Sequence, residues 1–267
     1  MKPFSYGQLM DWHKCQKYFY FKRVMGLSDG VELSGDVAFG SCLHLGIQDL
    51  FEGGDGVDMF TSYWGFQEEK NLEYSRYKHT DLLPLGQQLV EIFRDEHQKK
   101  FTPASCPKTG EPLIERRLEG RIGSHPFCGV VDLVGGFAGL LSAVDWKTAA
   151  YPYDAYKIVC NEQLYGYVEL AKQDLGLAIE QVVYGVAVKD PKNPRWQFRK
   201  SAVTPEKLTI MLGNLEKACD AISSTTHFIR NPGQCVVGKR ICPFFQRCHG
   251  AGAHGGQGGG DKEGTEP

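Results

Sequence analysis

Four cysteines near the two ends of the chain could together hold a soft metal. Cys15 lies alone near the start, whereas Cys235, Cys242 and Cys248 follow one another near the end. Thiolates are the ligands of structural zinc and of iron–sulfur clusters, so the residues alone leave both metals open. The late cysteines are separated by six and five residues and include no Cys-x-x-Cys pair of the kind that structural zinc usually uses. The sequence therefore predicts a soft-metal site that closes a very long loop.

A carboxylate–lysine group in the middle of the chain could do hydrolytic chemistry. Asp145 and Lys147 lie two residues apart on a predicted strand and so share one of its faces. With Val144 and Trp146 packed into the core on the other face, the charged pair would lie at the open edge of the sheet. Asp132, on the preceding predicted strand, can face the same side. Two close carboxylates repel each other, a cost that a divalent cation removes, and hard oxygen ligands suit magnesium or manganese. Lys147 could then orient or help deprotonate a water and offset charge on a phosphate.

Side chains on two predicted helices could support this group. His44 lies one turn after Gly40, where it could present a nitrogen to a metal while the glycine permits close backbone approach. Gln163 and Tyr167 lie four residues apart and so share a helix face, from which they could orient Lys147 or hold a phosphate. An ordinary histidine and an ordinary amphipathic face are the simpler alternatives.

Helical and strand patterns place these residues in a chain that is helical first and then rich in strands. Strands are predicted over 112–122, 127–134, 140–147, 181–189 and 196–203, with Gly135-Gly136 turning between the second and the third. Helices are predicted from near residue 6 and over 36–51, 57–70, 82–100, 154–176 and 204–223.

Composition limits the class of protein. At 267 residues with 42% hydrophobic and 23% charged side chains, the chain predicts one globular domain over 1–248, with a helical lobe at about 36–100 before the sheet. Eight of the nineteen residues in 249–267 are glycine, which predicts a disordered tail. The sequence has neither an apolar run of membrane-spanning length nor a signal-peptide core, so we expect a cytoplasmic protein with reduced thiols and no membrane partner.

The net charge of −2 argues against a broad nucleic-acid-coating surface. Any contact with DNA must come from local patches, such as the basic and aromatic run at 14–23 or the pair Arg116 and Arg117. Interleaved basic and aromatic residues suit single strands, whose bases stack on aromatic rings. A solvated helix face is the simpler alternative for the first of these patches.

Four motifs read together resemble the PD-(D/E)xK superfamily. They are G-S-C-L-H (40–44), G-V-V-D (129–132), D-W-K (145–147) and Q-L-Y-G-Y (163–167). The resemblance covers most of residues 1–250 and is greatest for the RecB-like nucleases, including AddB and the CRISPR-associated single-strand exonucleases. It implies a restriction-endonuclease-like α/β core, in which helices flank a central mixed sheet, with an N-terminal helical lobe.

The same resemblance implies roles for individual residues. The metal ligands would be His44, Asp132, Asp145 and the Trp146 carbonyl; Lys147 would be catalytic, with Gln163 and Tyr167 supporting it. A [4Fe–4S] cluster, with zinc as the alternative, would be bound by Cys15, Cys235, Cys242 and Cys248. The other five cysteines lack partner spacing and read as buried or incidental thiols: Cys42, Cys106, Cys128, Cys160 and Cys219.

The implied function is metal-dependent cleavage of DNA, as an exonuclease on single strands or ends in recombination, repair or CRISPR-type processing. One alternative is a non-cleaving DNA-binding or assembly module with a structural cluster, and another is a site-specific endonuclease. The sequence contains no G-x-x-x-x-G-K-[ST] motif and so no nucleotide-driven motor of that kind. A separate helicase, recombination protein or CRISPR integrase would then supply the DNA ends.

Overall fold

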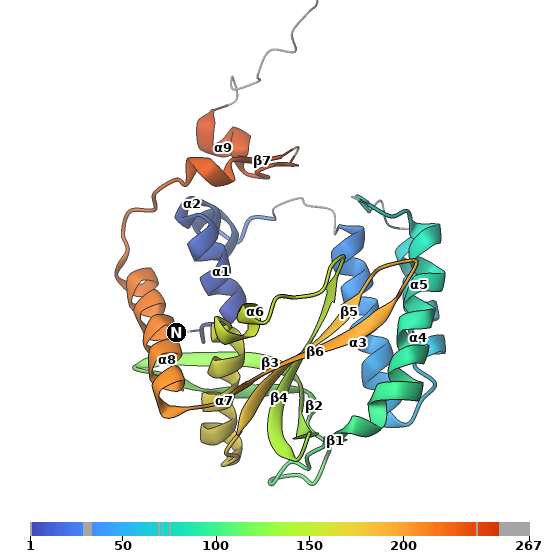
Figure 1. Ribbon diagram of the computed structural model, residues 1–267. Helices are drawn as coiled ribbons and strands as arrows, with labels where there is room; N and C mark the ends of the chain where they lie inside the picture. The colour runs from blue at the N-terminus through green and yellow to red at the C-terminus, as the bar shows by residue number, and fades with distance from the viewer. Residues whose placement is uncertain are drawn as a thin grey trace, which may run out of the picture. The chain divides into compact units, whose positions relative to one another are not determined.

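The chain forms two compact units in the computed structural model (Figure 1), which describes residues 2–28, 34–68, 70, 72–74, 76–238 and 240–250. The sheet unit comprises residues 1–9 and 32–225, and the terminal unit comprises residues 10–31 and 226–267. The expectation of one domain over 1–248 stays a prediction. The expected disordered tail lies outside the described residues from position 251 onward.

A mixed sheet forms the centre of the sheet unit. Its strands are β1 (Phe101–Pro103), β2 (Ile114–Ile122), β3 (His125–Phe137), β4 (Leu140–Ala149), β5 (Gln181–Val188) and β6 (Arg195–Ala202). The order is β1-β3-β4-β5-β6, with β2 also pairing with β3. β4 and β5 are parallel and the other pairs are antiparallel. This confirms the expected central mixed sheet of an α/β fold.

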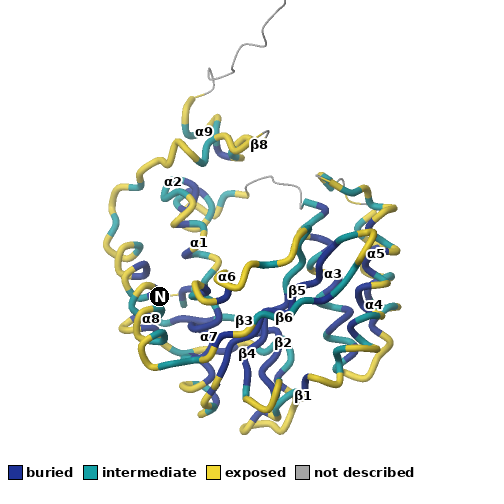
Figure 2. The backbone as a smooth tube through the Cα atoms, viewed as in Figure 1, coloured by how far each residue is buried: buried dark blue, intermediate teal, exposed yellow. Residues whose placement is uncertain are grey.

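Helices cover both faces of this sheet (Figure 1). One face packs against α3 (Gly35–Glu52), α4 (Val57–Glu68) and α5 (His79–Ile92), and the other against α7 (Glu162–Leu175) and α8 (Pro205–Ser224). β5 is buried along its whole length because it lies between these two layers (Figure 2). Short elements complete the unit: η2 (Phe93–His97), η3 (Gln98–Lys100) and α6 (Tyr156–Val159).

Strand β4 shows the expected alternation. Val144 and Trp146 are 0% and 2% exposed and belong to the core beneath α3, α4 and α5. Asp145 therefore faces the opposite side, as a period of two requires. The expectation that the charged pair lies at the open edge of the sheet stays a prediction: Asp145 is buried, and the pairing of β4 with β3 ends one residue before it, at Leu133–Val144.

The Gly135-Gly136 pair does not form the predicted turn. Both glycines lie within β3, and the chain turns at Ala138 and Gly139, whose φ angles are 51° and 82°. A Cβ atom on Gly135 would lie 2.4 Å from the backbone oxygen of Thr102. These positions therefore allow β1 to approach β3 closely rather than turn the chain.

Helix ends mostly follow local signals. α3 ends at Gly53 with φ of 90°, and Thr204 caps α8 by accepting a hydrogen bond from the Lys207 amide at 3.3 Å. The predicted helix over 154–176 is interrupted, because Asn161 caps a new helix, α7, through a 3.2 Å hydrogen bond from the Leu164 amide. The predicted helix over 82–100 begins earlier and continues as η2 and η3.

The terminal unit is built from short elements. They are the second half of α1 (Tyr6–Lys14), α2 (Gln16–Phe19), η1 (Tyr20–Val24), η4 (Pro232–Gln234), β7 (Val236–Val237), β8 (Arg240–Ile241) and α9 (Phe245–His249). Its buried cluster is small and centres on the rings of Tyr18, Phe21 and Phe244. Among the helices that the structure describes, none has the length and apolarity to cross a membrane.

Candidate active site and cysteine pocket

The candidate active site lies where the sheet forks. Strands β3 and β4 pair from Phe137–Leu140 only as far as Leu133–Val144, while β3 continues beside β2 and β4 beside β5. One residue beyond the last pair, the Asp132 carboxylate accepts a hydrogen bond from the Trp146 amide at 2.6 Å. A buried side chain thus joins the two strands where their backbone pairing has ended.

His44 reaches the other backbone group of Trp146, its carbonyl, from α3. Its Nε2 lies 2.7 Å from the Trp146 carbonyl oxygen, and since a carbonyl only accepts, Nε2 carries the proton and Nδ1 keeps a free lone pair in the neutral ring. Burial lowers the pKa of His44, although the Asp145 charge opposes this, so the neutral ring is favoured. A Cβ atom on Gly40 would lie 3.4 Å from Thr148 Oγ1, an ordinary van der Waals contact, so the spacing here does not require the glycine that was expected to permit close approach.

Glu115 on β2 completes a group with metal-ligand spacing. The Nδ1 atom of His44 lies 3.6 Å from Asp132 Oδ2 and 3.9 Å from Glu115 Oε1. The ligand atoms of these three residues all lie within 4.8 Å of one another, as one divalent cation would require. Glu115 also has φ of 45°, in the left-handed region that side chains rarely adopt. Such backbone strain is concentrated at functional sites.

Sequence reasoning missed Glu115. It directly precedes Arg116 and Arg117, and the sequence draws attention to those two residues as a basic patch for DNA rather than to the acid beside them. Its one signal was its place on the predicted strand 112–122, before the strand that carries Asp132. The extended register of β2 and β3 sets these two carboxylates opposite each other.

Asp145 and Lys147 form a close ion pair beside this group. The Lys147 Nζ atom lies 2.9 Å from one Asp145 carboxylate oxygen and 2.6 Å from the other. Burial alone would lower the pKa of Lys147, but the Asp145 charge and hydrogen bond outweigh it and raise that pKa. Lys147 is therefore a cation at neutral pH.

The carboxylates of the site carry more negative charge than this lysine can offset. Burial raises the pKa of Asp132 well above its usual range, and the charges of Asp145 and Glu115 raise it further. Burial and Asp145 likewise raise the pKa of Glu115 to about 7. Crowded, buried carboxylates of this kind are stabilised by a divalent cation, so the donor set fits magnesium or manganese.

The structure brings Gln163 and Tyr167 together on α7. The Gln163 amide donates a hydrogen bond to the Tyr167 hydroxyl at 2.7 Å. The Tyr167 ring covers Gly129 on β3, where a Cβ atom would lie 2.3 Å from the ring. Burial raises the pKa of Tyr167; the Gln163 hydrogen bond opposes this rise, and the charges of Asp145 and Asp132 add to it. The tyrosine thus lies within electrostatic reach of the acids.

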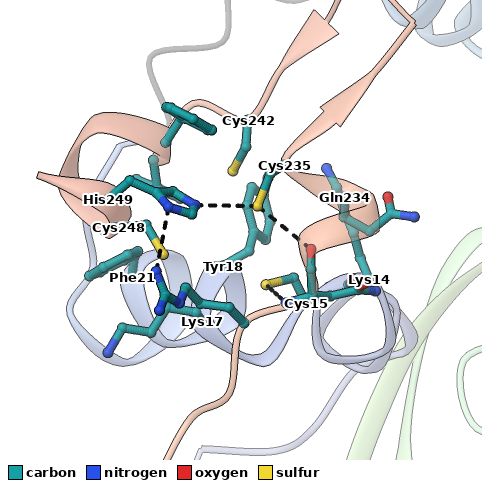
Figure 3. Close-up of a pocket in the computed structure, with 14 residues that line it drawn as sticks. Lys14, Cys15, Lys17, Tyr18, Phe21, Gln234, Cys235, Cys242, Cys248 and His249 are labelled. Carbon is teal, nitrogen blue, oxygen red and sulfur yellow. Dashed lines mark hydrogen bonds between the residues drawn. The ribbon is translucent and has the colours of Figure 1, made fainter. Parts of the chain in front are cut away.

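All four predicted cysteine ligands line one pocket in the terminal unit. Figure 3 shows the sulfur atoms of Cys15, Cys235, Cys242 and Cys248 pointing into it. The Cys15 sulfur accepts a hydrogen bond from the Asn231 amide at 3.4 Å, and the Cys235 sulfur lies 3.5 Å from His249 Nε2. Each of the four is partly buried.

The four sulfur atoms lie farther from one another than the ligand atoms of His44, Glu115 and Asp132, which we call the acidic group. Within the described residues, only His44, Glu115 and Asp132 meet the 4.8 Å spacing, and no three of the four sulfur atoms do. The other five cysteines all lie in the sheet unit, where four are buried and Cys160 is exposed.

Comparisons with known proteins agree with this geometry. The chain matches the model of the PD-(D/E)XK nuclease superfamily over residues 3–249. Its fold is similar to the crystal structure of a "Putative exonuclease" from Eubacterium rectale, with a TM-score of 0.56 and 16% identity over 90% of this chain and 91% of that one. The structure of SSO0001 matches over 90% of this chain and 96% of that one, but with 12% identity and a TM-score of 0.33. No curated protein matches. The forked sheet, the acidic group beside its lysine and the match over nearly the whole described chain lead to one conclusion: the chain belongs to the PD-(D/E)XK nuclease superfamily.

Proposed function

We propose that this protein is a divalent-metal-dependent DNA nuclease that hydrolyses phosphodiester bonds, as an exonuclease on single strands or ends. The observation that carries the proposal is the group formed by His44, Glu115 and Asp132, with the Asp145–Lys147 pair beside it. Superfamily membership supports phosphodiester hydrolysis. The exonuclease assignment draws on the motif resemblance to RecB-like nucleases and on the name of the Eubacterium rectale protein.

The residues of the acidic group would hold magnesium or manganese. His44 would use Nδ1, the atom that its hydrogen bond to the Trp146 carbonyl leaves unprotonated, and Asp132, Asp145 and Glu115 would supply carboxylate oxygens. The Trp146 carbonyl, which already accepts from His44, is the remaining proposed ligand. Such a cation lowers the pKa of a bound water and neutralises charge that develops on phosphate.

Lys147 would act as a charge rather than as a base. The Asp145 carboxylate, 2.6 Å from its Nζ atom, favours the charged form, and an ammonium has no lone pair with which to take a proton from water. It can donate hydrogen bonds to a phosphate oxygen and offset the negative charge that grows there. Gln163 and Tyr167 would position the site from α7.

The thiol pocket would hold a [4Fe–4S] cluster with a structural role. The absence of a Cys-x-x-Cys pair among the late cysteines and the motif resemblance to RecB-like nucleases favour a cluster over a single zinc ion. The cluster would be held by Cys15, Cys235, Cys242 and Cys248.

The decisive experiment is a cleavage assay on end-labelled single-stranded DNA with and without manganese. We expect progressive loss from an end, dependent on the metal and abolished in Lys147→Met, while a matched surface variant, Lys192→Met, cleaves normally. Strong binding without product at any metal concentration would instead identify a non-cleaving module. Discrete internal fragments from circular DNA would identify an endonuclease. Full cleavage by Lys147→Met would end the assignment of this site.

A further inference from the structure

An open cleft continues from the candidate active site along the carboxyl end of β4. It has a volume of about 610 Å³, and both His44 and Lys147 line it. Its far side is lined by Arg76 and Tyr77, from the segment that precedes α5, and by Lys189, which directly follows β5. A strand whose scissile phosphate lay at the acidic group would therefore have room to continue past these residues.

The cations of this cleft differ in what neutralises them. Lys147 is paired with Asp145, and Lys189 is buried and paired with Asp36 at 2.6 Å. Arg76 is exposed, and within the parts of the chain that the structure describes it forms no ion pair with a carboxylate. Arg76 is thus the lining cation with its charge available to an anion.

Two tyrosine rings lie beside the Arg76 guanidinium. The Cζ atom of Arg76 lies 5.2 Å from the centroid of the Tyr77 ring and 5.1 Å from the centroid of the Tyr151 ring. Tyr77 is itself anchored, because its hydroxyl donates to the Lys189 carbonyl at 3.1 Å. An arginine beside aromatic rings keeps its positive charge and its N–H donors, with which it can bind a phosphate.

Tyr151 leaves most of its ring open to solvent. It lies two residues beyond the end of β4 and is 69% exposed. An exposed aromatic ring beside a cation is the arrangement on which the bases of a single strand stack. A duplex keeps its bases stacked on one another and offers no such face.

We propose that Arg76 and Tyr151 form a strand-binding subsite, in which the guanidinium binds a backbone phosphate and the Tyr151 ring stacks on a base of single-stranded DNA. The subsite deepens the proposed nuclease function, on which it rests, by naming single strands as the substrate that the cleft selects. Arg76 supplies a contact that is independent of the base, and Tyr151 supplies the preference for an unpaired base.

The test measures binding in EDTA, so that it does not depend on cleavage. Fluorescence anisotropy would follow a labelled oligothymidine and an abasic strand of the same length. We expect Tyr151→Ala to weaken oligothymidine binding by roughly 5- to 100-fold and abasic binding not at all, whereas Tyr151→Phe binds both normally. We expect Arg76→Ala to weaken both strands and to lower the slope of log K against log salt by ~0.7.

Two surface variants serve as controls, Tyr63→Ala on α4 and Arg94→Ala on η2, and both should bind like the wild type. Unchanged oligothymidine binding in Tyr151→Ala, or an equal loss on the abasic strand, would overturn the stacking contact. An unchanged salt slope in Arg76→Ala, or a wild type that binds neither strand, would overturn the subsite. If the variants behave as expected but the wild type cleaves nothing with manganese, the nuclease assignment fails and the subsite remains.

Discussion

The acidic group and the thiol pocket both gather side chains that could bind a cation, yet the chain builds them in different ways. In the sheet unit, Asp132 accepts from the backbone N–H of Trp146 and His44 donates to the carbonyl of the same residue, on an interior strand. In the terminal unit, Cys15 and Cys235 are placed by helices and strands of two to nine residues. The sheet therefore forms the acidic group before any metal arrives, whereas the pocket has little besides its ligand to fix it.

The energetics of the two sites differ for the same reason. Burial raises the pKa of Asp132 and also of Cys242, so each site resists ionisation without a cation. The sheet unit can offset that cost with two extensive hydrophobic clusters. Among its described residues the terminal unit has only small groups of aromatic rings, around Phe244 and around Trp12, and small cores of that kind usually need a metal or a disulfide. We therefore expect the acidic group to lower the stability of the metal-free protein while serving activity, and the thiol pocket to raise stability once its metal is bound.

The largest expected effect is on activity, from Asp132→Asn. Asparagine still accepts the Trp146 hydrogen bond but removes a charge that Asp145 and Glu115 oppose. Cleavage should fall by ~10³-fold or more, because a metal ligand and its charge are lost. In EDTA, however, the unfolding free energy should rise by ~1 kcal/mol. Steady-state cleavage and denaturant unfolding measure the two effects. A less stable Asp132→Asn protein would contradict the claim that repulsion by Asp145 and Glu115 makes the Asp132 charge destabilising.

The thiol pocket should show the reverse behaviour. Protein purified without oxygen should be brown from sulfur-to-iron charge transfer, and Cys242→Ser should lose iron and unfold more easily by well over the ~1 kcal/mol of an ordinary substitution. Cys160→Ser, at an exposed thiol in the sheet unit, is the matched control and should change neither iron content nor stability. Iron analysis and thermal unfolding provide the readouts. Colourless protein with one zinc per chain would replace the cluster by zinc, and equal tolerance of both variants would remove the metal site.

A third, intermediate effect concerns pH. Folding raises the pKa of Glu115 from 4.5 to about 7, so the stability linked to this group is complete below pH 4.5 and is lost as the pH rises through about 7. In EDTA, the unfolding free energy of the wild type should fall by on the order of 1–3 kcal/mol across that window relative to Glu115→Gln. Manganese should reverse the difference above pH 7, since its ligands must be deprotonated. Parallel pH profiles for the two proteins would show that Glu115 does not titrate with folding.

Much of the acidic site followed from strand periodicity and motif order, because a period of two fixes which face each residue takes. This is why Asp145 and the pair Val144 and Trp146 could be assigned to opposite faces of β4. Glu115 escaped prediction because its relation to Asp132 depends on the register between two strands, which one sequence does not specify.

The errors came from features that tertiary contacts decide. The Gly135-Gly136 pair has the composition of a turn, but the close approach of β1 is what requires glycine there. Asn161 interrupts a helical pattern that continues on both sides, because its side chain caps α7.

The smallest expected effect tests how far the acidic group depends on its neighbours. Tyr167→Phe keeps the ring over Gly129 and removes only the hydroxyl that accepts from Gln163 at 2.7 Å. Losing one such hydrogen bond costs ~1 kcal/mol, and the partly exposed Gln163 amide can turn to water instead. Because Asp132 and His44 are fixed by the backbone N–H and C=O of Trp146 rather than by Tyr167, cleavage at saturating manganese should fall by less than ~10-fold. If Tyr167→Phe instead lost as much cleavage as Asp132→Asn, the hydroxyl would contact the substrate or the metal directly. The acidic group would then need Tyr167 as well as the backbone of Trp146 to be active.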